Sequence, residues 1–280
     1  MGIYLDSVGL TSDPIERSWT SRDAILYALS VGAGTEELSY TTEHGENGSG
    51  QQVLPTFALV AGGTGGFLIE YAGDFDPAQV VHGGQSFRLS GPIGTSGCVK
   101  TVSRIEGIYD KGTGALVEIV SSSTDAETGE PAFEARLTAF VRGEGGFGGP
   151  RGSAISPPHL KRRPDHQLVY ATLPVQALMY RLTGDRNRLH SDPTFAAQAG
   201  FPKPILHGLC TFGFVGRALL HSLCDSDPSQ LVGMDGRFVA PLYPGQELVV
   251  SIWEDASRAH FRAERTDGDV VLIGTGYTAE

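Results

Sequence analysis

The stretch that decides the fold runs Leu206-His207-Gly208-Leu209-Cys210-Thr211-Phe212-Gly213-Phe214-Val215-Gly216-Arg217-Ala218-Leu219-Leu220-His221-Ser222-Leu223. It predicts a helix from about Leu206 to Leu223 in which apolar residues occupy every side and three glycines form gaps. A helix without a polar face is buried, so we expect a sheet to wrap around it.

Segments typical of β-strands follow in two sets. The first covers residues 86–89, 99–109, 116–122 and 132–141, and the second covers 236–239, 248–255, 259–265 and 270–278. Each set comes after a short amphipathic helix, predicted at 23–29 and at 174–183. The repeated order predicts a degenerate duplication of the α+β class. We therefore divide the chain into a first half at 1–142, a linker at 143–165 and a second half at 166–280.

The composition fits a globular protein and excludes some partners. With 280 residues and 40% hydrophobic content, the chain has ample material for a core. The net charge of −11 argues against nucleic acid, and no basic patch or long apolar run indicates a membrane. Cys98, Cys210 and Cys224 are too few and too irregular for a disulfide framework. With neither an N-terminal leader nor a C-terminal peroxisomal address, the expected location is the cytoplasm.

A glycine-rich segment at 142–152 superficially matches a dinucleotide-binding loop. Such a loop needs an apolar helix after it, because the helix dipole must point at the pyrophosphate. Here a run rich in proline and charge follows, up to Asp165. We interpret the segment as part of the linker and expect no nucleotide cofactor.

Candidate chemistry lies in the loop Gly184-Asp185-Arg186-Asn187-Arg188-Leu189-His190. Asp185 and His190 can exchange protons with a bound water, and the Asn187 amide can orient that water. The loop is pinned, because Gly184 ends one helix and Asp192 can cap the next. These residues indicate addition or removal of water. A structural alternative is that Asp185 caps a turn and His190 is a satisfied, half-buried imidazole.

The first turn of the 206–223 helix supplies a second part of this candidate site. Its unpaired N–H groups and the positive end of its dipole lie near Gly208, where no side chain blocks a ligand. The Gly208 N–H is therefore a natural donor to the oxygen of a polarised carbonyl. An apolar tunnel, such a donor and an acid/base loop are the parts needed to hydrate a double bond conjugated to a thioester.

These residues resemble the hydratase 2 domain of the MaoC-like hotdog superfamily. Its motif Gly-Asp-x-Asn-Pro-Leu-His-x-Asp-Pro is similar to residues 184–193, and its Gly-Phe-x-x-Pro-Ile-Leu-His-Gly-Leu segment is similar to residues 200–209. The resemblance extends through the stretches 52–57, 81–85, 110–112 and 145–149. It implies a double hotdog, in which each half wraps an antiparallel sheet around a central helix. It also implies an enzyme, expected as a homodimer, that interconverts trans-2-enoyl-CoA and (3R)-3-hydroxyacyl-CoA with no metal or redox cofactor.

The resemblance assigns roles residue by residue. Asp185 and His190 match the catalytic acid/base pair, without indicating which of them activates the water. Asn187 matches the orienting amide, and Gly208 matches the donor to the thioester oxygen. Positions that contact the acyl-CoA substrate are matched by His82, Gly83, Lys111, Arg186, Arg188, Leu189 and Phe238.

Two of these assignments have structural alternatives, and one position departs from the family pattern. Lysine in an Asp-Lys-Gly turn is usually exposed and without a function, and a strand phenylalanine ordinarily fills the core, so both alternatives remain for Lys111 and Phe238. Arg188 stands where the family usually has proline. It can pair with Asp192 or approach a CoA phosphate, and we expect activity to survive because the catalytic side chains are present.

The first half departs more deeply from the motif. Where the acid/base loop would lie, it reads Val31-Gly32-Ala33-Gly34-Thr35, which has no carboxylate and no imidazole. One active site per chain is therefore expected. Glycines between 62 and 66 should break the first half's central helix and leave room for a long acyl chain. The alternative is that neighbouring side chains such as Phe67 and Leu68 fill the gap.

The leading interpretation is an (R)-specific enoyl-CoA hydratase that also runs in reverse as a dehydratase. A hotdog thioesterase is the alternative within enzymes, because it would also use an acidic residue and a helix N-terminus but would attack the carbonyl carbon. A non-catalytic acyl-CoA binding protein is the alternative of another class, and it would be expected to lack the Asp185/His190 pair.

Overall fold

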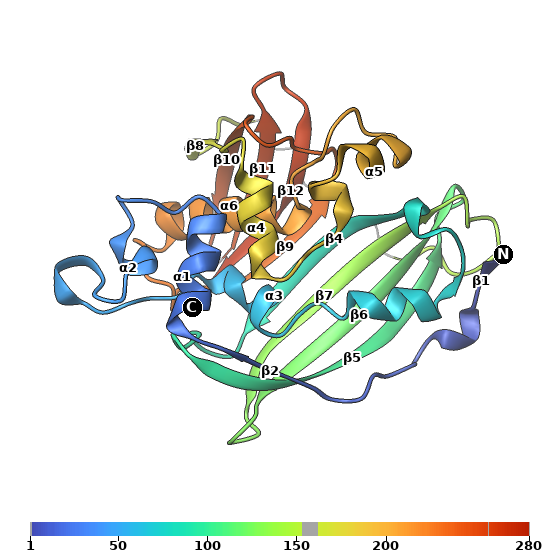
Figure 1. The fold of residues 1–280 in the computed structure, drawn as a ribbon, viewed down its shortest axis with the longest axis horizontal. Helices are drawn as coiled ribbons and strands as arrows, with labels where there is room; N and C mark the ends of the chain where they lie inside the picture. Colours follow the sequence, from blue (N-terminus) through green and yellow to red (C-terminus); the bar gives the residue numbers. More distant parts are fainter. Residues whose placement is uncertain (1, 153–161, 257, 280) are drawn as a thin grey trace.

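The structure is a computed structural model that describes residues 2–152, 162–256 and 258–279. Ten strands form one antiparallel sheet in the order β2-β5-β6-β7-β4-β9-β12-β11-β10-β8. Five strands come from each half, so the two expected hotdog sheets are joined edge to edge (Figure 1). Residues 153–161 of the predicted linker lie outside the described residues.

The strands and helices have the following bounds. The first half contributes β2 (Ile15–Trp19), β4 (Val80–Leu89), β5 (Gly97–Asp110), β6 (Gly114–Asp125) and β7 (Pro131–Arg142). The second half contributes β8 (His166–Ala171), β9 (Leu231–Phe238), β10 (Glu247–Asp255), β11 (Arg258–Arg265) and β12 (Val270–Thr278). A separate pair is made by β1 (Gly2–Ile3) and β3 (Gly73–Asp74). The helices are α1 (Ser21–Ser30), α2 (Leu38–Thr41), α3 (Ala58–Ala61), α4 (Gln176–Tyr180), α5 (Pro193–Gln198) and α6 (Gly208–Leu223). Among the described helices, none is both long and apolar enough to cross a membrane.

The eight predicted strands are present, and the sequence missed the two edge strands, β2 and β8. An edge strand has a neighbour on one side only, so its residues show a weaker apolar pattern. In β2 the three central residues are all exposed, and in β8 Val169 points to solvent. Neither segment therefore alternates apolar with polar residues, because β2 has three polar residues in a row and β8 has apolar residues at both its half-buried and its exposed positions.

The two halves meet where β4 pairs with β9. The register sets Gly84 opposite Arg237 and Gln85 opposite Gly236. A Cβ atom on Gly84 would lie only 2.9 Å from the carbonyl oxygen of Gly236, so the close approach of the two strands requires glycine there. The pairing makes the two hotdog sheets a single continuous layer.

Helix α6 is the expected central helix of the second half, and it packs against β8, β9, β10 and β12. Its phenylalanines 212 and 214 and its leucines 219 and 220 are at most 1% exposed, which confirms the prediction of burial on all sides. The helix begins at Gly208, two residues later than predicted, because His207 has an extended backbone with φ −57° and ψ 134°.

Two of the glycine gaps of α6, at Gly213 and Gly216, are places where the first half packs against it. A Cβ atom on Gly213 would lie 2.5 Å from the Val31 side chain, and one on Gly216 would lie 2.5 Å from the Thr56 methyl group. Larger residues at these positions would push the first half away from the helix. The central helix of one half is thus also a packing surface for the other.

The central helix of the first half is broken, as predicted. Helix α3 ends at Ala61, and after Gly62 the chain passes through Gly63 and Gly65 in left-handed conformations, with φ of 75° and 67°. The expectation of free space beside these glycines fails at Gly62. A Cβ atom there would lie 2.4 Å from the Phe133 ring and 2.6 Å from the Ser123 hydroxyl, so side chains already fill this gap.

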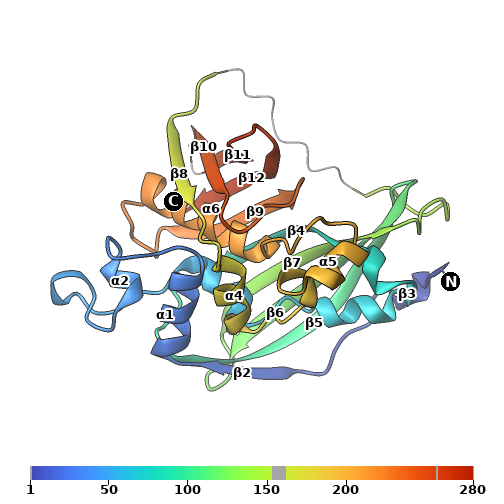
Figure 2. The ribbon, with the colours of Figure 1, turned by 45° about the horizontal axis from the view of Figure 1, so that its top comes forward.

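The helices on either side of the candidate loop also follow the prediction. Helix α4 continues as a 3-10 turn over Arg181–Thr183, and Gly184 follows with φ of 128°. The Asp192 carboxylate accepts hydrogen bonds from the backbone N–H groups of Thr194 and Phe195, so it caps α5 as expected. Helices α1 and α4 lie side by side in Figure 2, joined by a hydrogen bond from Gln176 to the Ser30 carbonyl.

A buried ion pair ties the segment after α1 to the far end of α6. Glu37 binds both the Arg217 guanidinium and His221, and the side chains of Glu37 and Arg217 are only 12% and 5% exposed. Arg217 also donates to the Val31 carbonyl at 3.0 Å. Burial alone would raise the pKa of Glu37, but hydrogen bonds from His221 and Arg217 outweigh it and lower the pKa to about 2.

Replacing Glu37 with Gln should leave the Arg217 charge buried without a carboxylate. We expect the free energy of unfolding to fall by about 3–5 kcal/mol, measured by urea denaturation at pH 7. Glu43→Gln changes an exposed glutamate of the same segment and should stay within about 0.5 kcal/mol of wild type. Because the pKa of Glu37 is lower in the folded protein, its stabilisation is fully present above pH 4.5, the usual pKa of a glutamate, and is lost as the pH falls toward about 2. The free energy of unfolding of Glu37→Gln should therefore depend less on pH in that window than that of wild type. Equal effects of the two substitutions would contradict this interpretation.

Candidate active site

The candidate loop after Gly184 is held by its own polar groups. The Asp185 carboxylate accepts a hydrogen bond from the Asn187 backbone N–H at 3.1 Å. The Asn187 side-chain oxygen in turn accepts one from the Leu189 N–H at 3.0 Å, which caps the 3-10 turn Arg188–His190. This capping bond uses the oxygen of the Asn187 amide and leaves its NH₂ group available.

His190 is buried and has a defined tautomer. Its Nδ1 lies 2.9 Å from the Ile205 carbonyl oxygen, which can only accept, so the proton is assigned to Nδ1. The ring is 8% exposed, and burial lowers its pKa below the usual 6.5, although the Ile205 hydrogen bond and the Asp185 charge act in the opposite direction. His190 is therefore neutral at pH 7, and its Nε2 lone pair can accept a proton.

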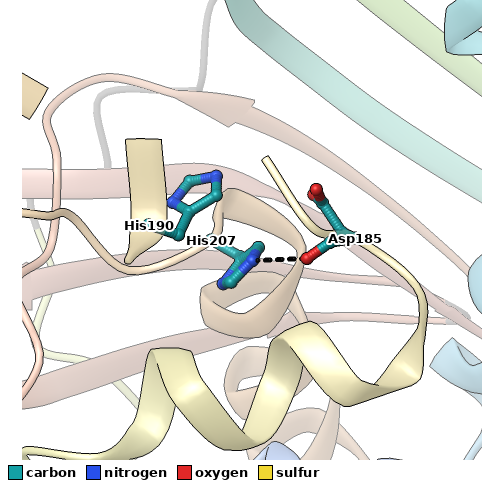
Figure 3. A group of neighbouring side chains, drawn as sticks. All are labelled: Asp185, His190 and His207. Atoms are coloured by element: carbon teal, nitrogen blue, oxygen red, sulfur yellow. Dashed lines mark hydrogen bonds between the residues drawn. The ribbon is translucent and has the colours of Figure 1, made fainter. Parts of the chain in front are cut away.

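Sequence reasoning missed a second imidazole at this site, His207. Its ring stacks on that of His190, with centroids 3.7 Å apart, and its Nε2 donates to the Asp185 backbone carbonyl at 3.2 Å (Figure 3). The His-Gly dipeptide at the start of a buried helix was visible in the sequence, but the inward direction of the ring was not. The structure thus brings together Asp185, His190 and His207.

These three side chains are of the types that bind metal ions, and their donor atoms lie within 4.8 Å of one another. The arrangement nevertheless opposes a shared metal. The imidazole rings of His190 and His207 each have one nitrogen hydrogen-bonded to a backbone carbonyl, and the two rings stack with only 27° between their planes. Lone pairs of ring nitrogens lie in the ring planes, so those of stacked rings do not converge on one ion.

Gly208 lies directly after His207 and begins α6. The N–H groups of Cys210 and Thr211 donate to the His207 carbonyl, whereas the Gly208 and Leu209 N–H groups have no hydrogen-bond partner among the described residues. A Cβ atom on Gly208 would lie 3.1 Å from the Phe238 ring, so a side chain here would be crowded. The Gly208 N–H can therefore donate to a ligand oxygen, with the helix dipole adding to the attraction.

His82, Gly83 and Phe238 meet at the junction of β4 and β9. The His82 ring lies 4.7 Å from the Phe238 ring, and its Nε2 donates to the Gly84 carbonyl at 3.1 Å. Gly83 is the extra residue of a β-bulge between β4 and β7, a feature that redirects neighbouring side chains. Burial lowers the pKa of His82 to about 4, although the charge of nearby Asp185 acts in the opposite direction. Phe238 also packs against the core, as its structural alternative predicted.

The remaining loop residues lie at the surface. Arg186 and Arg188 are exposed and Leu189 is half-buried. Arg188 binds the Asp192 carboxylate through Nη2 at 2.5 Å and lies over the Phe195 ring. This pair was one of the two partnerships considered for Arg188. Asn187, with φ −54° and ψ 127°, has a backbone that would also suit a following proline, as in the family motif.

Lys111 lies in the turn between β5 and β6, on the first half. Its ammonium group donates to the Arg151 carbonyl. The neighbouring Asp110 carboxylate accepts hydrogen bonds from the backbone N–H groups of Gly112, Gly146 and Gly148. The described part of the glycine-rich segment, up to Gly152, therefore folds over this turn.

Comparisons with known proteins agree with this geometry. The MFE-2 hydratase 2 N-terminal domain matches residues 18–143, and the MaoC like domain matches residues 156–274. The chain is 43% identical over 274 residues to 3-hydroxyacyl-thioester dehydratase Y of Mycobacterium tuberculosis, covering 96% of this chain and 94% of that protein. It is 42% identical over 288 residues to the enoyl-CoA hydratase ChsH3 of the same organism, covering 98% of each. A MaoC-like dehydratase from Phytophthora capsici has a similar structure, with a TM-score of 0.88, 27% identity and coverage of 99% of this chain and 98% of that chain. The chain therefore belongs to the MaoC-like hydratase and dehydratase family, in the double-hotdog form that carries a hydratase 2 N-terminal domain.

Proposed function

We propose that the protein catalyses the reversible hydration of trans-2-enoyl-CoA to (3R)-3-hydroxyacyl-CoA. One observation carries the proposal. The Asp185 carboxylate and the neutral, buried His190 lie together beside the first turn of α6, where the Gly208 N–H is open to a ligand. Full-length relatives named as an enoyl-CoA hydratase and a 3-hydroxyacyl-thioester dehydratase support an activity on acyl thioesters.

In the hydration direction, the thioester oxygen would accept a hydrogen bond from the Gly208 N–H. The pair Asp185 and His190 takes one proton from a water molecule, whose oxygen bonds to C3 of the substrate. The electron pair of the double bond moves toward the thioester, and the Gly208 N–H stabilises the negative charge on its oxygen. The same pair then delivers a proton to C2, which restores its starting state. The NH₂ group of Asn187, whose oxygen accepts from the Leu189 N–H, is proposed to hold the water.

A cavity of about 240 Å³ supports an acyl-chain site on the first half. Its apolar lining comes from Trp19, Leu26, Phe57, Val60, Ala61 and Leu182. Two of its lining residues, Leu182 and Thr183, immediately precede the Gly184–Asp185 loop in the chain. The cavity lies beside Val60 and Ala61, not beside Gly62 where the sequence suggested space. We infer that enoyl chains of medium length are accepted here.

We infer that Lys111, Arg186 and Arg188 attract the CoA phosphates, and that His82, Gly83, Leu189 and Phe238 border the acyl thioester. The first half (1–142) would accommodate the substrate, and the second half (166–280) would carry the catalytic residues.

A homodimer is supported by the exposed apolar residues Val175, Leu178 and Leu182 near α4, and light scattering tests it. A cytoplasmic location fits the free thiols of Cys98, Cys210 and Cys224, and imaging of a tagged chain tests it.

Purified protein should hydrate trans-2-enoyl-CoA to the 3R product without added metal or nucleotide, because the proposed site moves protons with side chains alone. A chelator should leave the rate unchanged. The measurement is loss of enoyl absorbance combined with chiral analysis of the product. Release of free CoA as the main reaction would favour a thioesterase, tight binding without turnover would favour a binding protein, and a 3S product would overturn the stereochemical assignment.

Replacing Asp185 with Asn, or His190 with Gln, should lower kcat by about 10²–10⁴-fold while substrate still binds. The reason is that each change removes a proton-transfer group but keeps a polar side chain of similar size. His260→Gln, a histidine of β11 that binds Thr275, is the matched control and should keep wild-type turnover. Near wild-type kcat in either site variant would remove that residue from the mechanism.

The acyl cavity predicts a chain-length effect. Leu26→Trp should fill the cavity and lower kcat/KM for a ten-carbon enoyl-CoA by about tenfold or more, while the four-carbon substrate is unaffected. Leu29→Trp places the same side chain on the exposed face of α1 and should affect neither substrate. If Leu26→Trp handles the long substrate as well as wild type does, the acyl chain lies elsewhere.

A further inference from the structure

His207 connects the two parts of the proposed active site. It is 1% exposed, and its Nε2 donates to the Asp185 backbone carbonyl at 3.2 Å. The next residue along the chain, Gly208, carries the N–H proposed to bind the thioester oxygen. One side chain therefore ties the loop that holds the carboxylate to the helix end that holds the oxyanion donor.

The ring of His207 packs against two other rings. The ring centroid of Tyr180 lies 4.8 Å from that of His207, and the ring centroid of His190 lies 3.7 Å from it. Tyr180 is itself buried, at 1% exposure. A ring held in this way cannot swing freely, so the direction of its Nε2–H bond is fixed by packing.

His207 is not arranged to move protons. Because Nε2 donates to a carbonyl, the neutral ring has its lone pair on Nδ1, and this atom is buried and has no hydrogen-bond partner among the described residues. In Figure 3 the Nδ1 side of the ring points away from Asp185. Burial, together with the neighbouring His190, holds the pKa of His207 well below its usual range, so the ring stays neutral.

We propose that His207 is a positioning residue: its Nε2–H bond to the Asp185 carbonyl sets the distance between the Asp185 carboxylate and the Gly208 N–H. This rests on the proposed function, in which the first group acts at C2 and C3 of the substrate and the second at the thioester oxygen. The substrate fixes the separation of those atoms, so the protein must match it. A misplacement of about 1 Å in such an arrangement can cost about 10²-fold in rate.

Two substitutions separate the hydrogen bond from the ring. His207→Gln keeps a donor, because the Gln Nε2 is as many bonds from Cα as the His Nε2, but it loses the ring. His207→Phe keeps the ring and loses the donor. We expect kcat of the Phe variant to fall by about 10–10²-fold with KM nearly unchanged, and kcat of the Gln variant to stay within about fivefold of wild type. His260→Phe repeats the chemical change on β11 and should leave both constants unaltered.

Two further readouts distinguish positioning from other roles. In the pH profile of kcat, the Phe variant should be lowered at every pH with both limbs kept, whereas loss of a limb would show that His207 transfers a proton and would overturn the proposal. Hydrogen exchange of the 183–191 peptide should be faster in Phe than in Gln or wild type, because the loop has lost its anchor.

The possible results distinguish failure of the His207 proposal from failure of the proposed function. The positioning role would be overturned if His207→Phe kept both the kcat and the hydrogen exchange of wild type. It would also be overturned if His207→Phe and His207→Gln lost kcat equally. If wild type hydrates no enoyl-CoA, the proposed function fails, and the exchange comparison alone still decides whether His207 anchors the loop. Should the Phe variant not fold, His207→Leu removes the same donor, and failure of both to fold while Gln folds would make the role structural and overturn the proposal.

Discussion

The pairing of β4 with β9 is the constraint on which the rest of the structure depends. It brings two hotdog sheets into one layer, and it is possible because Gly84 presents no side chain to the Gly236 carbonyl. The same pairing sets His82 beside Phe238, and Phe238 lies over Gly208 at the start of α6. The wall of the candidate site is therefore built by both halves, although the proposed acid/base residues come from the second half alone.

In the first half, the segment at the position of the acid/base loop packs against α6. The segment that takes the place of the acid/base loop starts at Val31, whose side chain fills the gap at Gly213 and whose carbonyl accepts from Arg217. Glu37 then completes the ion pair with Arg217 and His221. This segment, which has no carboxylate and no imidazole between Val31 and Thr35, thus holds the central helix of the other half through packing and an ion pair.

Burial gives the imidazoles of the site their properties. His82, His190 and His207 are all shifted toward the neutral form, mainly because a charged ring would lose its hydration in this environment. Backbone carbonyls then determine which nitrogen carries the proton, and the lone pair of His190 is left on the nitrogen that Ile205 does not bind. The acceptor that the chemistry needs is thus a consequence of packing and of one main-chain hydrogen bond.

The sequence by itself determined the buried helix, eight of the ten strands of the main sheet, the caps of α5 and the loop that carries Asp185, Asn187 and His190. These features follow from local periodicity and from residues near in the chain, which is why pattern reasoning reached them. The tertiary structure alone decided that His207 points inward onto His190, that Phe133 closes the space beside Gly62, and that a cavity opens beside Leu26 and Leu182. Each of these depends on contacts between segments far apart in the chain, and the direction of a side chain across such a contact is set by packing, which no local pattern contains.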